Sequence, residues 1–131
     1  MTNKVHLSQV DELIIVGLNS TTLLAAAGTY IGDVFPVGGY THISGFAFSN
    51  VSSATNGLRI EQGLREADFP TGAVATANVT RSVYSIIGND IDNNAFAAQV
   101  VAPFARIVYV NGASVQTVFK LYGEARILRG L

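Results

Sequence analysis

Cysteine and tryptophan are absent from this chain of 131 residues, and histidine is scarce. Without cysteine, the chain can form no disulfide, zinc-thiolate site or iron-sulfur cluster, and it has no cysteine nucleophile. The two histidines, His6 and His42, are too few for a three-histidine metal site within one chain, and they leave few candidates for acid-base catalysis. We therefore expect neither a cofactor nor enzymatic activity.

Charge is also scarce. Charged residues make up 13% of the chain, with 8 basic against 9 acidic, whereas an ordinary soluble domain has about 25%. This balance argues against nucleic-acid binding, which requires clustered Lys and Arg. The hydrophobic content of 49% and the mean hydropathy of +0.36 exclude disorder for most of the chain, and the length suits one domain.

The N-terminal residues lack the basic start, apolar run and cleavage site of a secretory signal. We therefore expect the protein to act where it is made or to be carried to its site of action by a partner. Residues 13–32 carry no Asp, Glu, Lys or Arg, which is the length of a membrane span. Their Asn, Ser, Thr and Gly content predicts two strands and a turn instead, with no membrane insertion.

Short hydrophobic runs of period two, separated by Gly, Asn, Ser and Pro, are typical of a β-sandwich or barrel. Strands are predicted over residues 13–18, 30–35, 41–48, 57–62, 80–87, 96–101, 105–110 and 115–127. These eight strands predict an all-β fold, an antiparallel β-sandwich in which jelly-roll wiring is one possible arrangement. Residues 13–131 form the single domain, and residues 1–12 are predicted to be an arm that orders on assembly.

The clearest alternation lies in residues 41–48, where Ile43 and Ala47 share one face. Phe46 and Phe48 share the other face, and their size predicts that this second face lies in the core.

Turn chemistry supports the strand boundaries. The Asn111-Gly112 pair lies between two apolar runs, which predicts a β-hairpin because both residues tolerate positive φ. Helix, if any is present, is predicted to be confined to about one turn around residues 64–68. Further turns are predicted at Gly38-Gly39, Asn56-Gly57 and Asn89-Asp90.

A weak metal-site pattern is present at Asp90, Asp92 and Asn94, which repeat the first three oxygen ligands of a calcium loop. The sixth and twelfth positions are Ala95 and Val101, where an EF-hand has Gly and Glu. A turn stabilised by Asn and Asp side chains is the favoured interpretation, and a calcium site of another kind is the alternative.

Three carboxylates, Glu61, Glu66 and Asp68, lie close in sequence, as in a glycosidase pair, but their spacing fixes no catalytic geometry. Ion pairing at the surface is favoured, with three candidate partners: Arg59, Arg65 and Arg81.

His42 and Ser44 lie near each other without a nucleophile elbow. The prediction for His42 is therefore a hydrogen-bonded strand histidine. Five tyrosines could form a sugar-stacking platform or, more commonly, core edges and interfaces: Tyr30, Tyr40, Tyr84, Tyr109 and Tyr122.

Three segments carry a resemblance to a known group of proteins: Gly57-Leu58-Arg59-Ile60-Glu61-Gln62, residues 103–112 (PFARIVYVNG) and residues 116–122 (QTVFKLY). Their pattern resembles small β-sandwich structural proteins of tailed-bacteriophage virions. In that pattern an L-x-I-x-Q-S strand, often followed by a Ser-Asp-Gly-x-x-Trp turn, precedes a hairpin. The first strand of the hairpin ends in Tyr-x-Asn-Gly, and its second strand contains Gln-x-x-Phe-x-Leu. Here the turn has no Trp, and Phe69 is the aromatic residue in its place.

The resemblance implies a virion role without chemistry, as a capsid decoration, cement or minor capsid protein. It implies a homotrimer made in the host cytoplasm and located at the capsid surface, with the major capsid protein as its partner. Lysines that normally blunt sheet edges are limited to Lys4 and Lys120, which also favours self-association. The alternative, based on the tyrosines, is a receptor- or glycan-binding module of a phage tail or spike.

Interface candidates follow from the arm, the predicted hairpin and the apolar C-terminal tail with its two arginines. A last strand packed onto the sheet is an equal alternative for the tail. The candidates are Val5, Leu7, Val10, Tyr109, Arg126, Ile127, Leu128, Arg129 and Leu131.

Overall fold

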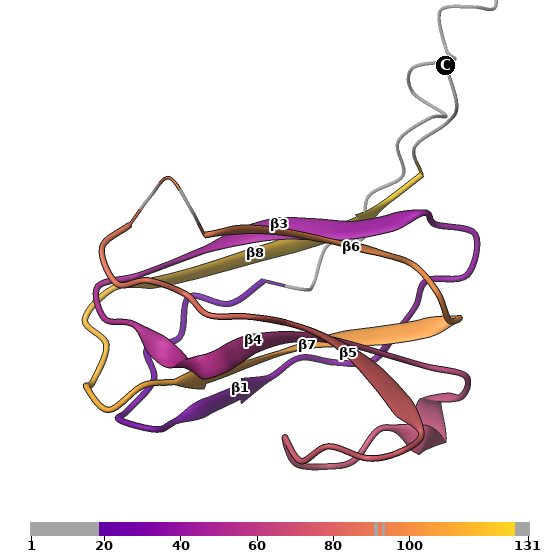
Figure 1. The fold of residues 1–131 in the computed structure, drawn as a ribbon, viewed down its shortest axis with the longest axis horizontal. Helices are drawn as coiled ribbons and strands as arrows, with labels where there is room; N and C mark the ends of the chain where they lie inside the picture. The colour runs from indigo at the N-terminus through magenta and orange to yellow at the C-terminus, as the bar shows by residue number, and fades with distance from the viewer. Residues whose placement is uncertain (1–18, 91, 93, 128–131) are drawn as a thin grey trace, which may run out of the picture.

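The computed structural model describes residues 19–90, 92 and 94–127, and it shows two antiparallel β-sheets packed face to face (Figure 1). The predicted all-β sandwich of eight strands is confirmed. The predicted strand over residues 13–18 and the arm over residues 1–12 lie outside the described residues. The elements are β1 (Thr29–Ile31), β2 (Phe35–Pro36), β3 (His42–Ser49), β4 (Ser53–Gly63), the 3-10 turn η1 (Glu66–Asp68), β5 (Val79–Tyr84), β6 (Ala95–Gln99), β7 (Phe104–Asn111) and β8 (Phe119–Arg126).

We call the sheet with strand order β6-β3-β8 sheet A, and the sheet with order β1-β7-β4-β5 sheet B; β2 also pairs with β7. The chain passes from one sheet to the other after β2, β3, β5, β6 and β7. Among the described strands, β4 and β5 are neighbours both in sequence and in one sheet through six paired residues. Most pairing is therefore between strands that are distant in sequence.

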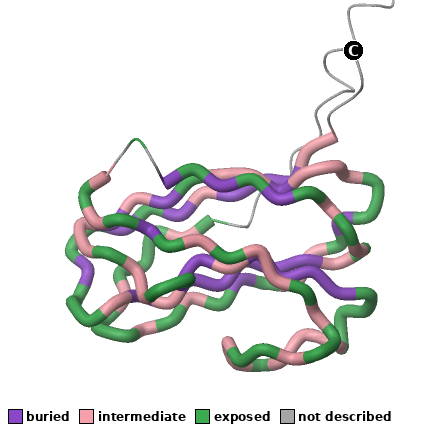
Figure 2. Tube along the Cα trace, in the orientation of Figure 1, coloured by how far each residue is buried: buried purple, intermediate pink, exposed green. Residues whose placement is uncertain are grey.

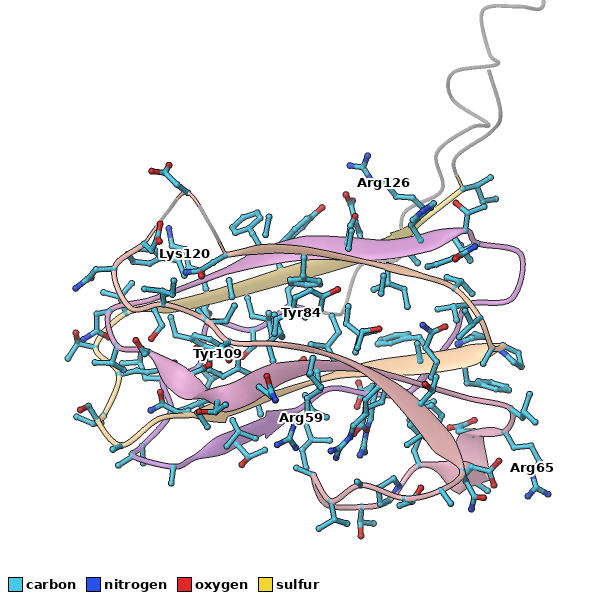
Figure 3. All side chains as sticks on the ribbon, in the orientation of Figure 1. Arg59, Arg65, Tyr84, Tyr109, Lys120 and Arg126 are labelled. Atoms are coloured by element: carbon cyan, nitrogen blue, oxygen red, sulfur yellow. The ribbon has the colours of Figure 1, made fainter. Side chains whose placement is uncertain are left out.

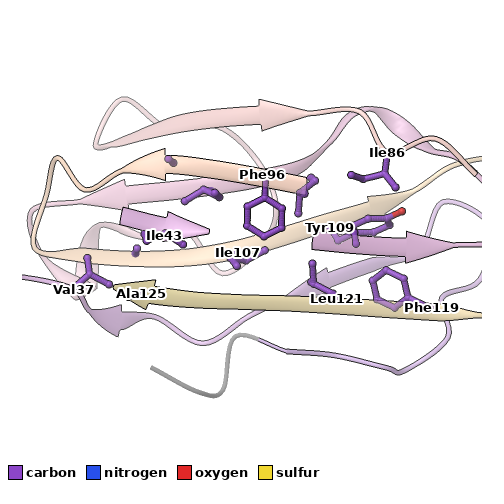
Figure 4. Packing of buried hydrophobic residues seen from close by; sticks show 14 residues of the cluster. Val37, Ile43, Ile86, Phe96, Ile107, Tyr109, Phe119, Leu121 and Ala125 are labelled. Carbon is purple, nitrogen blue, oxygen red and sulfur yellow. The ribbon is translucent and has the colours of Figure 1, made fainter. Parts of the chain in front are cut away.

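The core lies between the sheets and is formed by the inward side chains of both (Figure 4). The rings of Tyr109 on β7 and Phe119 on β8 meet at 4.8 Å between centroids and link the two layers. Each fully buried aliphatic or aromatic side chain contributes about 1.5–3 kcal/mol to folding. The main buried residues are Ile43, Ala47, Leu58, Ile60, Phe96, Ile107, Leu121 and Ala125.

The two faces of β3 are reversed relative to the prediction. Ile43 is 1% exposed and points into the core, whereas Phe46 is 49% exposed and Phe48 is half-buried on the outer face. The alternation correctly separated the two faces of the strand. The prediction that the face with the two phenylalanines lies in the core is wrong. Phe46 instead stacks on Tyr122 across the strand pair, with ring centroids 5.5 Å apart.

The predicted hairpin at Asn111-Gly112 is wrong, because β7 belongs to sheet B and β8 to sheet A. Neither residue has the positive φ that a tight Asn-Gly turn requires. The Asn111 side chain donates to the carbonyl oxygens of Ala25 and Ser114, at 2.9 and 2.8 Å. A Cβ on Gly112 would lie 2.4 Å from the Ser52 carbonyl oxygen. The pair therefore serves close packing where the chain leaves sheet B.

Asn56-Gly57, predicted as a turn, is instead an irregularity inside β4, where the register against β7 shifts between Ser53 and Leu58. Asn56 has a φ of 54°, as expected for an extra residue that bends a strand. The predicted turns at Gly38-Gly39 and Asn89-Asp90 and the predicted helical turn are confirmed.

The apolar stretch at residues 13–32 is described from residue 19 onward. It contains a turn at Ala27, with a φ of 58°, followed by β1. Across the described part of the chain, no helix has the length and hydropathy needed to cross a membrane.

Candidate functional site

The outer face of sheet B carries a buried ion cluster built from three adjacent strands. Glu61 on β4 lies directly opposite Arg81 on β5 and Arg106 on β7. One carboxylate oxygen of Glu61 accepts from Arg106 Nε at 2.7 Å, and the other accepts from Arg81 Nε at 3.0 Å. Glu61 is 0% exposed, so the pair with Arg81 predicted at the surface is formed in the interior.

A segment that we call the strap, residues 64–78 between β4 and β5, folds beneath this face of sheet B (Figure 1). Arg106 donates to the carbonyl oxygens of Pro70 and Gly72, at 2.7 and 2.9 Å. Its guanidinium also lies over the ring of Phe69, 5.6 Å from the centroid, a favourable cation-π geometry.

Two more arginines hold the next residue of the strap. Arg81 and Arg59 both donate to the Ala73 carbonyl oxygen, at 2.7 and 2.9 Å. Figure 3 shows Arg59 pointing from sheet B towards the strap. Backbone carbonyls and one carboxylate therefore occupy these guanidinium groups, and the cluster works as a structural clamp.

The other acidic candidates have separate partners. Asp68 pairs with Arg65 at 3.0 Å, and Arg65 is 77% exposed, so the predicted surface ion pair is confirmed there. Glu66 is exposed in the same 3-10 turn. Glu61 is thus held in the clamp and Asp68 pairs with Arg65, so these two carboxylates have separate arginine partners.

The outer face of sheet A has a different chemistry. Cross-strand neighbours of β3 and β8 place Phe46 beside Tyr122 and Phe48 beside Lys120. The neighbouring edge strand β6 adds exposed Ala95. This face therefore presents aromatic rings and methyl groups with one lysine.

At the other end of this face the polar side chains are paired. Glu124 accepts from the Tyr122 hydroxyl at 2.9 Å and from Arg126 Nε at 2.6 Å. The hydrogen bond to Glu124 raises the pKa of Tyr122 above its ordinary value. His42 Nδ1 lies 3.0 Å from the Thr41 hydroxyl, which confirms the prediction of a hydrogen-bonded strand histidine.

A hollow of about 390 Å³ opens on the outer face of sheet A near the β5–β6 connection. We call it the sheet A hollow. Its lining residues are Phe46, Ala47, Phe48, Asp92, Asn94, Ala95 and Lys120. Figure 3 shows Lys120 at this end of the sheet.

The calcium-loop candidates lie beside this hollow. Asn94 is buried, and its amide accepts from Ile87 N at 3.1 Å and donates to the Ile87 and Asp90 carbonyls at 2.8 Å each. The Asp90 carboxylate accepts from Asp92 N at 2.8 Å. These bonds match the turn interpretation, because the Asn94 oxygen is committed to the backbone of the loop itself.

The structure corrects the prediction of Tyr109 as an interface residue, because Tyr109 is 0% exposed and lies between the sheets. Burial raises its pKa to about 12. Tyr122 lies on the outer face of sheet A, so the five tyrosines do not form one platform.

Of the remaining interface candidates, Arg126 and Ile127 are half-buried at the end of β8. The others, Val5, Leu7, Val10, Leu128, Arg129 and Leu131, lie outside the described residues.

The two sheets also differ in how one edge is protected. On β6, the Ala97 carbonyl accepts from the Tyr84 hydroxyl at 2.7 Å, and the Gln99 carbonyl accepts from Gln62 Nε2 at 2.9 Å. Figure 3 shows Tyr84 between the sheets. The edge strand β5 contains neither Lys nor Pro, and its one charged side chain, Arg81, is held by Glu61 and the strap. Of these two edge strands, β5 is therefore less protected than β6 against the addition of another strand.

Large apolar side chains are exposed at several places in the part of the chain that the structure describes. They are Leu23, Ile31, Phe46, Leu64, Val74, Val83, Ile87, Val101, Val115 and Val118.

Comparison with known proteins supports the fold. No protein-family model and no curated protein matches the chain. The crystal structure of the PBSX exported protein XepA matches with a TM-score of 0.64 and 15% identity, covering 91% of this chain and 38% of that one. The chain thus spans well under half the length of that protein. A pilus protein of Bacillus endospore appendages matches with a TM-score of 0.39 and 15% identity over 90% of this chain and 91% of that one, which is too low to carry an argument. At this identity the first likeness extends to the sandwich fold alone.

Proposed function

We propose that this chain is a non-enzymatic structural protein of a virion, which decorates or stabilises a capsid through self-association and contacts with the major capsid protein. The observation that carries the proposal is the combination of internalised charge and exposed apolar side chains. Arg106 and Glu61 are buried, while Phe46, Val83 and other large apolar residues are exposed. A surface of this kind favours association.

The edge of β5 is proposed as one side of the contact between copies of the chain, with a different surface of the neighbouring copy as the other side. Val83 on this strand is 42% exposed, and no lysine or proline blocks the addition of another strand. We propose a homotrimer, because the three-fold positions of a capsid would each accept three equivalent subunits.

The sequence resemblance of residues 57–62, 103–112 and 116–122 to virion proteins of tailed phages supports the shell as partner. Repeated weak contacts on a symmetric shell would add up to firm attachment. The two buried carboxylates in the described residues, Glu61 and Glu124, both pair with arginines, which fits a structural role better than catalysis.

Co-sedimentation with capsids tests the proposal. The full chain is mixed over a range of concentrations with empty and genome-filled shells of the virus that encodes it, and the pelleted protein is quantified. We expect saturable binding with a fixed number of copies per shell. Absence of binding to both kinds of shell at every concentration would overturn the proposal.

A further inference from the structure

The sheet A hollow combines a flat apolar wall with polar groups at its rim. Phe46 is 49% exposed and stacks on its cross-strand neighbour Tyr122, with ring centroids 5.5 Å apart. Ala95 and Phe48 complete the apolar lining. A rigid, half-exposed ring of this kind is well suited to contact the C–H face of a planar or chair-shaped ligand.

The rim supplies two opposite charges. Asp92 and Lys120 both line the hollow and are both exposed. Within the described residues, neither side chain has an ion pair or a hydrogen bond from its charged group. A carboxylate accepts hydrogen bonds from hydroxyl groups and an ammonium group donates them, and their charges sum to zero. The rim therefore suits a neutral ligand that carries several hydroxyls.

We propose that the sheet A hollow binds one pyranose unit of a neutral saccharide. The sugar's C–H face packs on Phe46, and its hydroxyl groups bond to Asp92 and Lys120. The volume of about 390 Å³ lies within the range of small-molecule sites. This site is separate from the β5 edge, so the saccharide proposal can fail without affecting the capsid proposal, and the converse also holds.

The test is an NMR titration of the full, isotope-labelled chain. The probes are the methyl glycosides of glucose, galactose, mannose, N-acetylglucosamine and rhamnose. We expect at least one glycoside to shift the amide signals of Phe46, Ala95 and Lys120 together. We expect Phe46→Ala to weaken this binding about tenfold, the loss of about 1.4 kcal/mol of ring contact.

Two variants make the result specific. Phe46→Tyr keeps the ring and should retain binding, which separates loss of stacking from loss of fold. Leu64→Ala removes a comparably exposed apolar side chain from the strap, and it should leave binding unchanged. The proposal is overturned if all five glycosides leave the hollow signals unmoved, if the shifts map elsewhere, or if Leu64→Ala weakens binding as much as Phe46→Ala.

Discussion

The outer faces of the two sheets differ in how far they are covered by the rest of the chain. Sheet B covers its outer face with the strap, which arginines on three strands hold through carbonyl oxygens and the buried Glu61 carboxylate. As a result β7 is buried continuously from Ala105 to Tyr109, as Figure 2 shows. Sheet A leaves its aromatic outer face open, with Phe46 half-exposed.

The comparison shows where the few charges of the chain act. Arginines that would normally keep a surface soluble are turned inward to clamp the strap, so their side chains do not blunt the sheet edges. The apolar side chains that remain outside are then available for contacts with other molecules. The internal use of charge and the proposed self-association would both follow from this low-charge composition.

The largest expected effect is on the clamp. Glu61→Ala leaves Arg106 buried without its carboxylate and should lower the free energy of unfolding by about 3–5 kcal/mol. Urea denaturation measures this change. The control is Arg65→Ala, which removes an exposed ion pair and should change the free energy by no more than about 1 kcal/mol. Equal losses of unfolding free energy for the two substitutions would contradict the claim that the buried clamp stabilises the fold more than an exposed ion pair does.

The second comparison separates the two faces of β3. Ile43→Ala creates a cavity in the core and should cost about 2–5 kcal/mol. Phe46→Ala removes a half-exposed ring from the outer face and should cost about 1 kcal/mol, mainly its stack on Tyr122. Thermal and urea unfolding of both variants measure the difference. A larger loss for Phe46→Ala would contradict the assigned orientation of β3.

A third substitution addresses the edge of sheet B. Val83→Lys puts a charge on β5 and should weaken self-association about tenfold, which corresponds to about 1.4 kcal/mol. Val115→Lys introduces the same charge at an exposed valine in the β7–β8 connection and should leave self-association unchanged. Sedimentation equilibrium compares the two variants, and the assignment of β5 fails if they behave alike.

The smallest expected effect is a pH dependence. The pKa of Tyr109 is raised by burial from 10.0 to about 12, so the unfolded chain loses this proton first as the pH rises. The contribution to stability is complete below pH 10 and declines between pH 10 and about 12. Tyr109→Phe should therefore show a shallower loss of unfolding free energy across this window in urea titrations. Parallel curves for the two proteins would rule out this role of Tyr109.

Local features of the fold were predictable from the sequence. Period-two runs placed seven of the eight predicted strands at strands of the structure, and Gly38-Gly39 and Asn89-Asp90 marked real turns. The errors concern choices that a local pattern does not contain. The alternation of β3 gives two equivalent faces, and Asn111-Gly112 looks the same whether its strands pair or separate into two sheets.

The clamp was missed for a similar reason. Glu61, Arg81 and Arg106 are far apart in sequence, and only the register of β4 with β5 and β7 brings them into one row. A signal was present, since Glu61 and Arg106 are each adjacent to a core isoleucine, Ile60 or Ile107, and alternation therefore places both charges on the opposite, outer face. Its meaning depends on strand order, which the hydrophobic pattern did not determine.

Native mass spectrometry of the full chain across a wide concentration range tests the central claim most directly, because internalised charge and an unblocked β5 edge should produce a self-associating subunit. The account predicts a trimer as the main species at high concentration, which dissociates to monomers only on dilution. A chain that stays monomeric at every concentration would contradict it.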